Sequence, residues 1–428
     1  MRLVDTIKNI WKIEDLRKRI LITILYVVIY RLGSFVVLPG VNPDTLTSLA
    51  SQTSEGLMAL LNMFSGGAFS NASIFALGIM PYISASIVMQ LAAIIIPSMQ
   101  KMQREGESGR RKINQWTRYL TVLILLIQAP AYLLNLDMQL RAAGASLPSG
   151  FMYRVFATVI LAAGSMFVLW LGERITDKGV GNGISLIIFA GIVAALPKNL
   201  GTIYHYVQAG TISYFSVFMF GVIALAMVVF VIHVETGFRR IPISYAKRVV
   251  GQRAYGGHSS HIPLKVNQAG VIPIIFASSV LMFPVTVAQF IDVPWVKTVA
   301  SYLEWGKPLQ TALYVGLIIF FTYFYTAVTV KIPDMADNLK KYGGFIPGIR
   351  PGKPTADYLD HVLTRITLAG SVFLAFIAVL PNMIAAATHI EGVYFGGTAL
   401  LIVVGVALQT MKQIESMVVM RHYEGFMK

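Results

Sequence analysis

One uncharged stretch, residues 56–100, decides the fold. It reads GLMALLNMFSGGAFSNASIFALGIMPYISASIVMQLAAIIIPSMQ and holds no Asp, Glu, Lys or Arg over 45 positions. About 20 mostly apolar residues cross a bilayer as a helix, so this stretch has room for two crossings. Similar uncharged stretches recur on both sides of it, and they include residues 119–136, 155–172, 179–197, 199–234, 266–291, 308–330, 366–390 and 392–411.

The composition agrees with a membrane protein. Of 428 residues, 56% are hydrophobic and only 13% are charged, and the mean hydropathy is +0.67. A soluble chain normally carries about 25% charged residues, so an ordinary cytosolic enzyme is excluded. The chain has no cysteine, which excludes disulfides, thiolate metal sites and cysteine nucleophiles.

The sequence predicts an all-α polytopic membrane protein with ten transmembrane helices, because a backbone in hydrocarbon must satisfy its own hydrogen bonds. The expected spans are residues 20–38, 74–96, 118–136, 153–173, 183–200, 213–234, 267–290, 309–330, 363–386 and 394–412. Five spans at 20–200 and five at 201–412 form two halves of opposite orientation, the arithmetic of inverted repeats. Residues 1–19 form an N-terminal segment with an interfacial helix at 3–16, and residues 413–428 form a tail.

The basic residues set the orientation. With ten spans, 29 of the 35 Lys and Arg residues fall on the side of both termini. This positive-inside pattern predicts cytoplasmic termini, and an extra crossing within 56–100 would destroy it. Part of that stretch therefore enters without crossing. We assign Leu57–Phe64, which ends at Gly66–Gly67, because eight helical residues rise only about 12 Å against a core of about 30 Å. Such a re-entrant half-helix implies a cavity inside the bundle.

Several kinds of chemistry have no support in the sequence. No phosphate-binding G-x-x-x-x-G-K-[ST] motif occurs, and the glycines at 179, 181 and 183 favour a turn, since no strand precedes them. His258 and His261 favour a solvated loop over a metal site. We expect no cofactor and no metal. Arg31, near the outer end of the first span, is expected to snorkel, and the spans lack the mid-membrane carboxylates of ion-coupled transporters.

Seven stretches carry a resemblance that covers residues 15–425 or so. They include NMFSGGAFSNASIFALGIMPYISASIVMQ (62–90), EGESGRRKINQWTRY (105–119) and DNLKKYGGFIPGIRPG (337–352). The others lie at 170–193, 239–253, 263–279 and 394–404. These stretches resemble the SecY family of bacterial protein-conducting channels. A secondary transporter with inverted repeats is the alternative, and an insertase or scaffold without an aqueous pore is a third class.

The resemblance implies a channel in the bacterial cytoplasmic membrane that translocates unfolded preproteins and releases membrane segments sideways into lipid. It implies two pseudo-symmetric halves, a plug over about 57–72 and a lateral gate. It also implies work with the SecE and SecG subunits, the SecA motor ATPase, the ribosome, signal sequences and lipids. The chain itself would be no enzyme and would take its energy from a partner.

The resemblance further implies a pore ring and a plug. The ring consists of branched apolar residues, which suit a constriction that gates by dewetting: Ile79, Ile83, Ile184, Ile188, Ile275 and Ile402. The members of each pair spaced four apart share one helix face. The plug residues carry no charge, so they need no ion pair inside a pore: Leu57, Leu60, Leu61, Asn62, Phe64, Gly66 and Gly67.

Two further sets complete the expected sites. The gate lies between the second, third, seventh and eighth spans, where interhelical hydrogen bonds of about 0.6 kcal/mol each would hold the seam: Ser84, Ser86, Gln90, Thr121, Gln128, Ser278, Ser279 and Phe283. The docking residues lie in the basic loops at 237–264 and 331–361, and they would contact ribosomal RNA phosphates and the motor: Arg239, Arg240, Lys247, Arg248, Arg253, Lys340, Lys341 and Arg350.

Overall fold

A helix lies on each of the ten predicted spans in the computed structural model, which describes residues 11, 13–42, 62, 64–142, 144–148, 150–210, 213–245, 248–250, 253–255, 259–288, 298, 302–303, 307–388 and 397–426. The first half contains α2 (Glu14–Gly33), α5 (Met80–Ile95), α7 (Glu107–Ala142), α8 (Phe151–Lys178) and α9 (Gly183–Gln208). The second half contains α10 (Tyr214–Thr236), α11 (Ile272–Ala288), α13 (Pro308–Thr329), α15 (Lys353–Thr388) and α16 (Gly397–Phe426).

Length and hydropathy support membrane crossing for most of these helices. Among the described residues, seven helices are long and apolar enough to span, or eight when α5 and the short α6 (Pro97–Arg104) count as one bent span. The axis turns by 103° between α5 and α6, at a break that Pro97 explains, because proline cannot continue the preceding helix. α2 carries charges in its first two turns, and α11 has only 17 residues.

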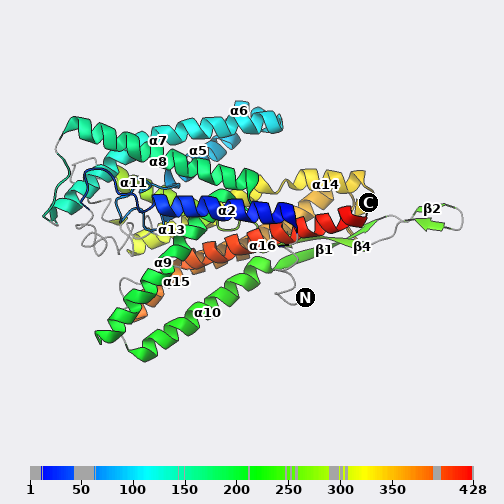
Figure 1. The fold of residues 1–428 in the computed structure, drawn as a ribbon. Helices are drawn as coiled ribbons and strands as arrows, with labels where there is room; N and C mark the ends of the chain where they lie inside the picture. Colours follow the sequence, from blue (N-terminus) through cyan, green and yellow to red (C-terminus); the bar gives the residue numbers. More distant parts are fainter. Residues whose placement is uncertain are drawn as a thin grey trace.

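The two halves repeat one pattern of helix contacts. In the first half α5 packs on α7, α7 on α8, α8 on α9, and α2 on both α8 and α9. In the second half α11 packs on α13, α13 on α15, α15 on α16, and α10 on α16. Each helix corresponds to the one five positions later, so corresponding helices run in opposite directions, as α2 and α10 do in Figure 1. The predicted inverted halves are therefore confirmed, and they meet where α5 contacts α11 and α9 contacts α16.

Strands at one end of the bundle depart from the all-α prediction. β1 (Phe238–Tyr245) pairs antiparallel with β4 (Ser259–Lys265) and with the short β5 (Gly344–Phe345), and β2 (Arg248–Val250) pairs with β3 (Arg253–Tyr255) beyond them. Ile241 and Leu264 of this ribbon are buried against α14 (Ile332–Lys341) and α15. Burial alternates on β1, where Ile241 and Ile243 are buried and Pro242 between them is exposed, but the residue types Phe-Arg-Arg-Ile-Pro-Ile-Ser-Tyr do not alternate, so the sequence carries no clear period-two signal for this strand.

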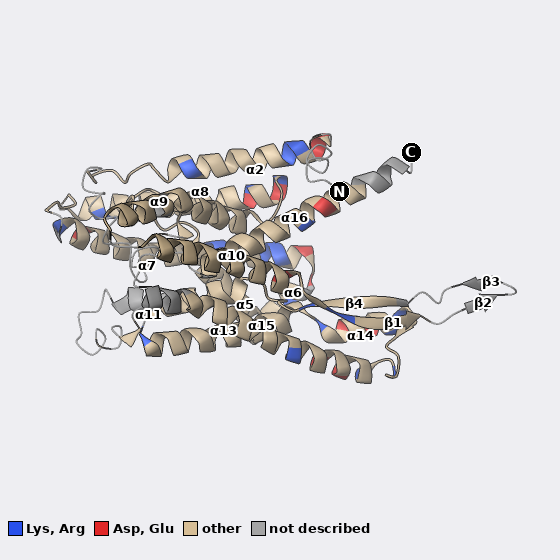
Figure 2. Cartoon of the chain, turned by 90° about the horizontal axis from the view of Figure 1, so that it is seen from below, with Lys and Arg blue, Asp and Glu red and all other residues tan. Residues whose placement is uncertain are grey.

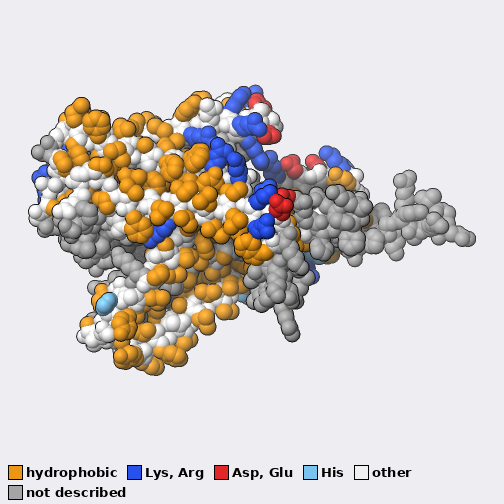
Figure 3. All heavy atoms as spheres, viewed as in Figure 1, with side chains coloured by type: hydrophobic (Ala, Val, Ile, Leu, Met, Phe, Trp, Pro, Cys, Tyr) orange, Lys and Arg blue, Asp and Glu red, His pale blue; other side chains and the backbone are white. Residues whose placement is uncertain are grey.

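Both ends of the described chain lie at the end of the bundle that carries the ribbon. The start of α2, the end of α16, α6, α14 and the strands all point to the same side in Figure 1. Most Lys and Arg residues gather at that end (Figure 2), while hydrophobic side chains cover most of the visible helix surface between the two ends (Figure 3). We call this side of the molecule the basic end.

The segment between α2 and α5 is less helical than predicted. Leu57, Leu60 and Leu61 of the expected half-helix lie outside the described residues. Residues 65–79 form successive turns, so α5 begins at Met80 instead of residue 74. The reason is a backbone pairing with the chain after α2, in which Leu38 N donates to Ala72 O (2.8 Å) and Ile74 N donates to Val36 O (3.0 Å). Residues 3–10 and 12 of the expected interfacial helix also lie outside the described residues.

Candidate functional site

The six predicted ring isoleucines come from four helices, two in each half. They stand at the start of α5 (Ile79, Ile83), in the first two turns of α9 (Ile184, Ile188), in α11 (Ile275) and in α16 (Ile402). Five of them are at most 8% exposed and belong to one hydrophobic cluster, and the half-buried Ile184 packs against it. These four helices make the most extensive contacts between the two halves. The predicted ring therefore lies where the halves meet.

Ile187 and Ile188 on α9 are neighbours with nearly equal burial, 1% and 3% exposed. A Cβ added at Gly172 of α8 would lie 3.5 Å from Cδ1 of Ile187 and 3.2 Å from Cγ1 of the ring residue Ile184, so both side chains lie near the helix beside them within the first half. Ile188 points about 100° further round the helix. Because the two residues are nearly equally buried but only Ile188 belongs to the predicted ring, comparing them shows whether an effect comes from the ring or from burial alone.

A polar cavity of about 410 Å³ lies on the side of the ring that faces the basic end. Its wall continues the ring helices: Asn182 lies before Ile184, Ile272 before Ile275, and Gly405 after Ile402. Other lining residues are polar or charged, among them Ser185, Glu235, Asn267, Gln409 and Lys412. An apolar constriction beside a polar cavity is the arrangement expected of a pore that is hydrated on one side and sealed at its waist.

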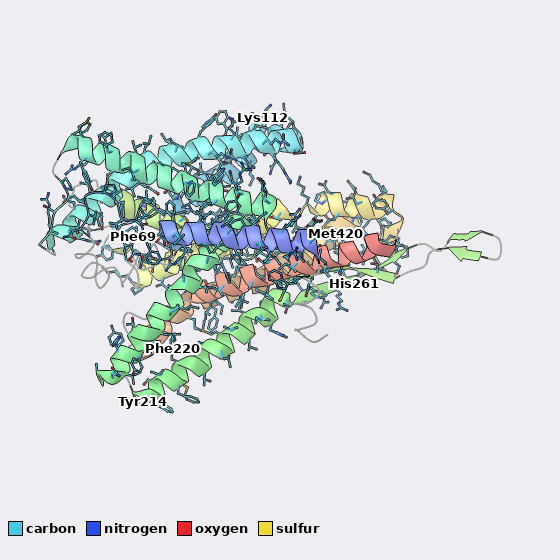
Figure 4. All side chains as sticks on the ribbon, viewed as in Figure 1. Phe69, Lys112, Tyr214, Phe220, His261 and Met420 are labelled. Carbon is cyan, nitrogen blue, oxygen red and sulfur yellow. The ribbon has the colours of Figure 1, made fainter. Side chains whose placement is uncertain are left out.

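The described part of the plug, residues 62 and 64–72, is packed into the first half. Phe64 is 5% exposed and joins the apolar cluster that contains the ring. Phe69 joins a second cluster and contacts the ring of Tyr132 at a centroid distance of 4.9 Å. In Figure 4, Phe69 lies towards the end of the bundle opposite His261 of β4. The plug and the ribbon therefore lie on opposite sides of the ring.

Arg31 does not extend to the membrane surface as predicted. Its Nη1 donates to the carbonyl oxygen of Gly66 in the plug, and its guanidinium lies 4.8 Å from the ring centroid of Phe35. Arg31 therefore has a hydrogen-bond partner inside the bundle, because the turn at Gly66 offers a carbonyl within reach. Tyr30 and Tyr132, whose hydroxyls bond to plug carbonyls, were not among the predicted site residues. A buried tyrosine hydroxyl needs a partner, and that signal was available in both apolar spans.

The gate residues lie on helices that pack together, but their hydrogen bonds do not cross the seam. Four hydroxyls donate to carbonyls three or four residues earlier in the same helix, at 2.7–3.2 Å: those of Ser84, Thr121, Ser278 and Ser279. The amide of Gln90 donates to Ser86 within α5 (3.1 Å). Gln128 is half-buried on α7, and the side chain of Phe283 lies outside the described residues.

The predicted interhelical bonds are therefore wrong for these hydroxyls. A serine or threonine on a helix in apolar surroundings satisfies itself on its own backbone at little cost, so it needs no neighbour. The α5–α11 contact is left to van der Waals packing between side chains.

The predicted docking residues gather at the basic end. Arg239, Arg240, Lys340, Lys341 and Arg350 are exposed, and no ion pair within the described part of the chain engages them. We call these five residues the docking surface. Arg248 and Arg253 lie on the outer strands β2 and β3, while Lys247 lies outside the described residues.

The turn that carries Arg350 is fixed. Gly348 and Gly352 adopt φ values of +83° and +102°, which favour glycine, and the hydroxyl of Thr355 donates to the Arg350 carbonyl at 2.8 Å. Since the turn fixes the backbone, it presents the Arg350 guanidinium to solvent at a defined place on the docking surface.

Comparison with known proteins gives one consistent result. A family model for SecY matches residues 73–411 of the chain. The protein translocase subunits SecY of Pseudomonas aeruginosa and Escherichia coli are each 45% identical to the chain over 97% of it and 94% of their own length. The SecY subunit of Halalkalibacterium halodurans is 47% identical over 99% of both chains.

Solved structures share the fold at low sequence identity. A protein-conducting channel superimposes with a TM-score of 0.64 at 20% identity, over 94% of this chain and 92% of that one. A SecY structure reported for a plug domain that stabilises the closed channel has a TM-score of 0.65 at 19% identity, with the same coverage. The channel of the canine endoplasmic reticulum, solved in complex with the ribosome, has a TM-score of 0.60 at 19% identity.

Proposed function

Since the chain belongs to the SecY family of protein translocase subunits and is a protein-conducting channel, we propose that its resting state is sealed by the isoleucine ring together with the plug. The observation that carries the proposal is the position of the ring. Its members stand on the four helices that join the two halves, and Phe64 of the plug lies in the same apolar cluster. Residues 20–200 and 201–412 then act as the two walls of one pore.

The chemistry of the ring suits a polypeptide substrate. Secreted chains differ in charge and shape, so fixed ion pairs in the pore would trap some of them. Branched apolar side chains exclude water and ions when they touch, without binding one substrate strongly. The polar cavity on the basic side keeps an arriving segment hydrated until it meets the ring.

The test of the seal is ion conductance. Serine or glycine at several ring positions, or deletion of residues 57–67, is expected to raise the resting conductance of the purified complex in planar bilayers while assembly stays intact. The matched control replaces the exposed isoleucines Ile24, Ile95, Ile127 and Ile232, which are 38–75% exposed, with serine. Unchanged conductance in both ring and plug variants would place the seal elsewhere.

We propose that hydrophobic segments leave sideways between α5 and α7 on one side and α11 and α13 on the other. The proposal is supported by the contact between α5 and α11, where the hydroxyls bond within their own helices, so that separation breaks no interhelical bond of theirs. Because the chain has no cysteine of its own, one introduced cysteine on each of α5 and α11 can form only the disulfide between these two helices within the chain. Oxidation is expected to block preprotein translocation and reduction to restore it. Full crosslinking with normal transport would contradict this gate.

The family is one of channel subunits rather than enzymes, and we propose that energy comes from partners that bind the docking surface: the SecA motor ATPase and the ribosome. The support is a set of exposed cations without ion-pair partners in the described residues, since ribosomal RNA offers phosphates to them. Arg350→Glu is expected to abolish export at unchanged expression. Normal export by this variant would show that Arg350 is not part of the docking surface.

We propose that the chain resides in the bacterial cytoplasmic membrane with the basic end in the cytoplasm, in complex with the SecE and SecG subunits. The positive-inside rule supports this orientation, because most Lys and Arg residues lie at the end that carries the start of α2 and the end of α16. Single cysteines near the two termini should react with an impermeant maleimide only from the cytoplasmic face. Labelling of either cysteine from the opposite face would contradict the proposed orientation of the chain in the membrane.

A further inference from the structure

Three side chains of the first half donate hydrogen bonds to backbone carbonyls of the plug. The hydroxyl of Tyr30 donates to Ser65 O (2.9 Å), and the hydroxyl of Tyr132 donates to Phe69 O (3.1 Å). Between them, the Arg31 guanidinium donates to Gly66 O. Donors from α2 and α7 thus bond to three carbonyls within five residues of the plug.

The three bonds differ in what the plug would lose without them. Inside the plug, Ala68 N donates to Ser65 O and Ala72 N donates to Phe69 O, both at 3.2 Å, so the tyrosine hydroxyls add a second donor to each of these carbonyls. Within the described residues, the buried Gly66 carbonyl accepts from Arg31 and from no backbone N–H. A buried carbonyl without a partner is unfavourable, so the Arg31 bond above all favours this one position of the plug.

Gly66 brings the plug into direct contact with a ring helix. Its φ is +64°, and a Cβ at this position would lie 2.7 Å from the Cα of Gly191 on α9. The plug backbone therefore touches α9 one turn beyond the ring residue Ile188. Tyr30 and Arg31 hold the carbonyls of Ser65 and Gly66, so they fix the part of the plug that meets α9.

Arg31 acts here as a hydrogen-bond donor. Within the described residues no carboxylate pairs with it, and its other contacts are Ser34 Oγ at 3.5 Å and the ring of Phe35. Tyr30 is 1% exposed and its ring stacks on Phe75 with planes 5° apart. Both side chains are thus aligned by neighbours before they reach the plug.

We propose that Tyr30, Arg31 and Tyr132 form a latch that positions the plug in the closed channel, an inference that rests on the proposed role of the plug as a seal. They are positioning residues: they touch the plug and act on the pore through it. Opening the channel breaks the latch, so weakening it shifts the resting channel toward the conducting state. Arg31 is the strongest member, because a charged donor makes a stronger bond than a neutral one.

Conductance of the purified complex tests the latch with small side-chain changes. Arg31→Gln and the double variant Tyr30→Phe/Tyr132→Phe are expected to raise the fraction of time spent conducting by roughly tenfold, the factor expected from the loss of a buried hydrogen bond. Arg31→Lys keeps a charged donor and should stay near the unmodified channel. The matched control is Tyr153→Phe, since the Tyr153 hydroxyl bonds to Pro39 O (2.9 Å) outside the plug.

A labelling experiment keeps the test independent of conductance. Ala68 is fully buried in the plug and the chain has no other cysteine, so Ala68→Cys reports plug release by its reaction with an impermeant maleimide. Labelling should be slow in the parent and in Tyr153→Phe, and faster in Arg31→Gln and in the tyrosine double variant.

The outcomes separate the latch from the seal. If deletion of residues 57–67 conducts while Arg31→Gln and the double variant neither conduct nor label faster, the latch is wrong and the plug remains a seal. If the deletion itself does not conduct, the plug is no seal and the latch falls with it. If Tyr153→Phe conducts as much as the latch variants, the bonds serve general packing and the latch is wrong.

Discussion

Two connecting segments occupy equivalent places in the two halves but differ in their charge and in where they pack. Residues 34–79 join α2 to α5, and residues 237–271 join α10 to α11. The first contains two acidic residues, Asp44 and Glu55, and no Lys or Arg, while the second contains six basic residues and no acidic one. In the part of the first connection that the structure describes next to α5, residues 64–79, several side chains belong to the same apolar cluster as the ring, whereas the second connection leaves the bundle as the β1–β4 ribbon.

The difference explains how equivalent connections in the two halves of an inverted repeat can be suited to different roles. Inversion puts equivalent connections on opposite sides of the membrane, so the positive-inside rule acts on one and spares the other. The uncharged part of the first connection, residues 56–79, is cheap to bury and is proposed to act as the seal. The second connection is rich in basic charge, stays in water and is proposed to act as a docking surface.

The largest effect is expected from giving the plug the charge of the ribbon. Ala68 is fully buried, so Ala68→Lys buries an ammonium without a partner, at a cost of about 3–5 kcal/mol. We expect the plug to leave its seat and the resting channel to conduct in planar bilayers. The matched control is Ser260→Lys on the exposed surface of β4, which should leave conductance unchanged. If the Ala68→Lys channel stayed sealed, charge would not be what decides that the plug is buried and the ribbon is exposed.

The next effect concerns the close approach of the plug to α9. Gly66 and Gly67 both have positive φ, but only at Gly66 would a Cβ meet another residue, Gly191 at 2.7 Å. Alanine at either position costs about 1–2 kcal/mol for its backbone conformation, and Gly66→Ala should cost about 1–3 kcal/mol more for overpacking. Thermal unfolding of the purified complex compares the two. Equal losses would contradict the contact between the plug and α9.

Removing exposed cations from the β1–β4 ribbon should weaken ribosome binding without changing the stability of the fold. Arg239 and Arg240 are exposed on β1, so replacing both with alanine should leave thermal unfolding unchanged. For each phosphate that the variant no longer binds, the slope of log affinity against log salt for ribosome binding should become shallower by about 0.7–0.9. Arg111→Ala is the control, because Arg111 is also exposed but pairs with Glu107 at 2.6 Å. An unchanged slope in the double variant would remove β1 from the docking surface.

The smallest effect is expected at the ion pair between α7 and α8. Arg118 makes two bonds to Glu173, at 2.9 and 2.7 Å, but the side chains are 49% and 28% exposed. Solvent screens such a pair, so Arg118→Ala should cost less than about 1 kcal/mol, with plug and ribbon unaffected. A larger loss of thermal stability would mean that charge at the basic end also holds the first half together.

The repeat was predictable because it rests on long-range regularities of composition, whereas the proposed ring follows from the resemblance to a known family. Uncharged runs locate the spans, the basic residues orient them, and the ring residues sit at motifs that resemble a known family. The charge count also predicts a segment that enters without crossing, since only such a segment preserves the 29 basic residues on one side.

Local geometry was less predictable where two parts of the chain compete for the same backbone groups. Residues 74–79 were predicted to begin the second span, yet backbone bonds from Ile74 to Val36 and from Leu38 to Ala72 hold this part of the chain in turns. Arg31 looks like a residue that reaches lipid headgroups, yet a plug carbonyl lies nearer. The hydroxyls of the gate look like seam bonds, yet their own helices satisfy them. The partners of Arg31, Val36 and Leu38 lie more than 30 residues away, so no local pattern reveals them, whereas the carbonyls that accept from the gate hydroxyls lie only three or four residues away in the same helix.

The central claim is that the seal lies where the two halves meet, and the two neighbouring isoleucines of α9 test it most directly. Ile188→Ser and Ile187→Ser introduce the same hydroxyl at positions 3% and 1% exposed, one in the ring and one packed against α8. Resting conductance of the two purified complexes is recorded side by side in planar bilayers. We predict a leak from Ile188→Ser and none from Ile187→Ser, and equal conductance in both would contradict a seal at this place.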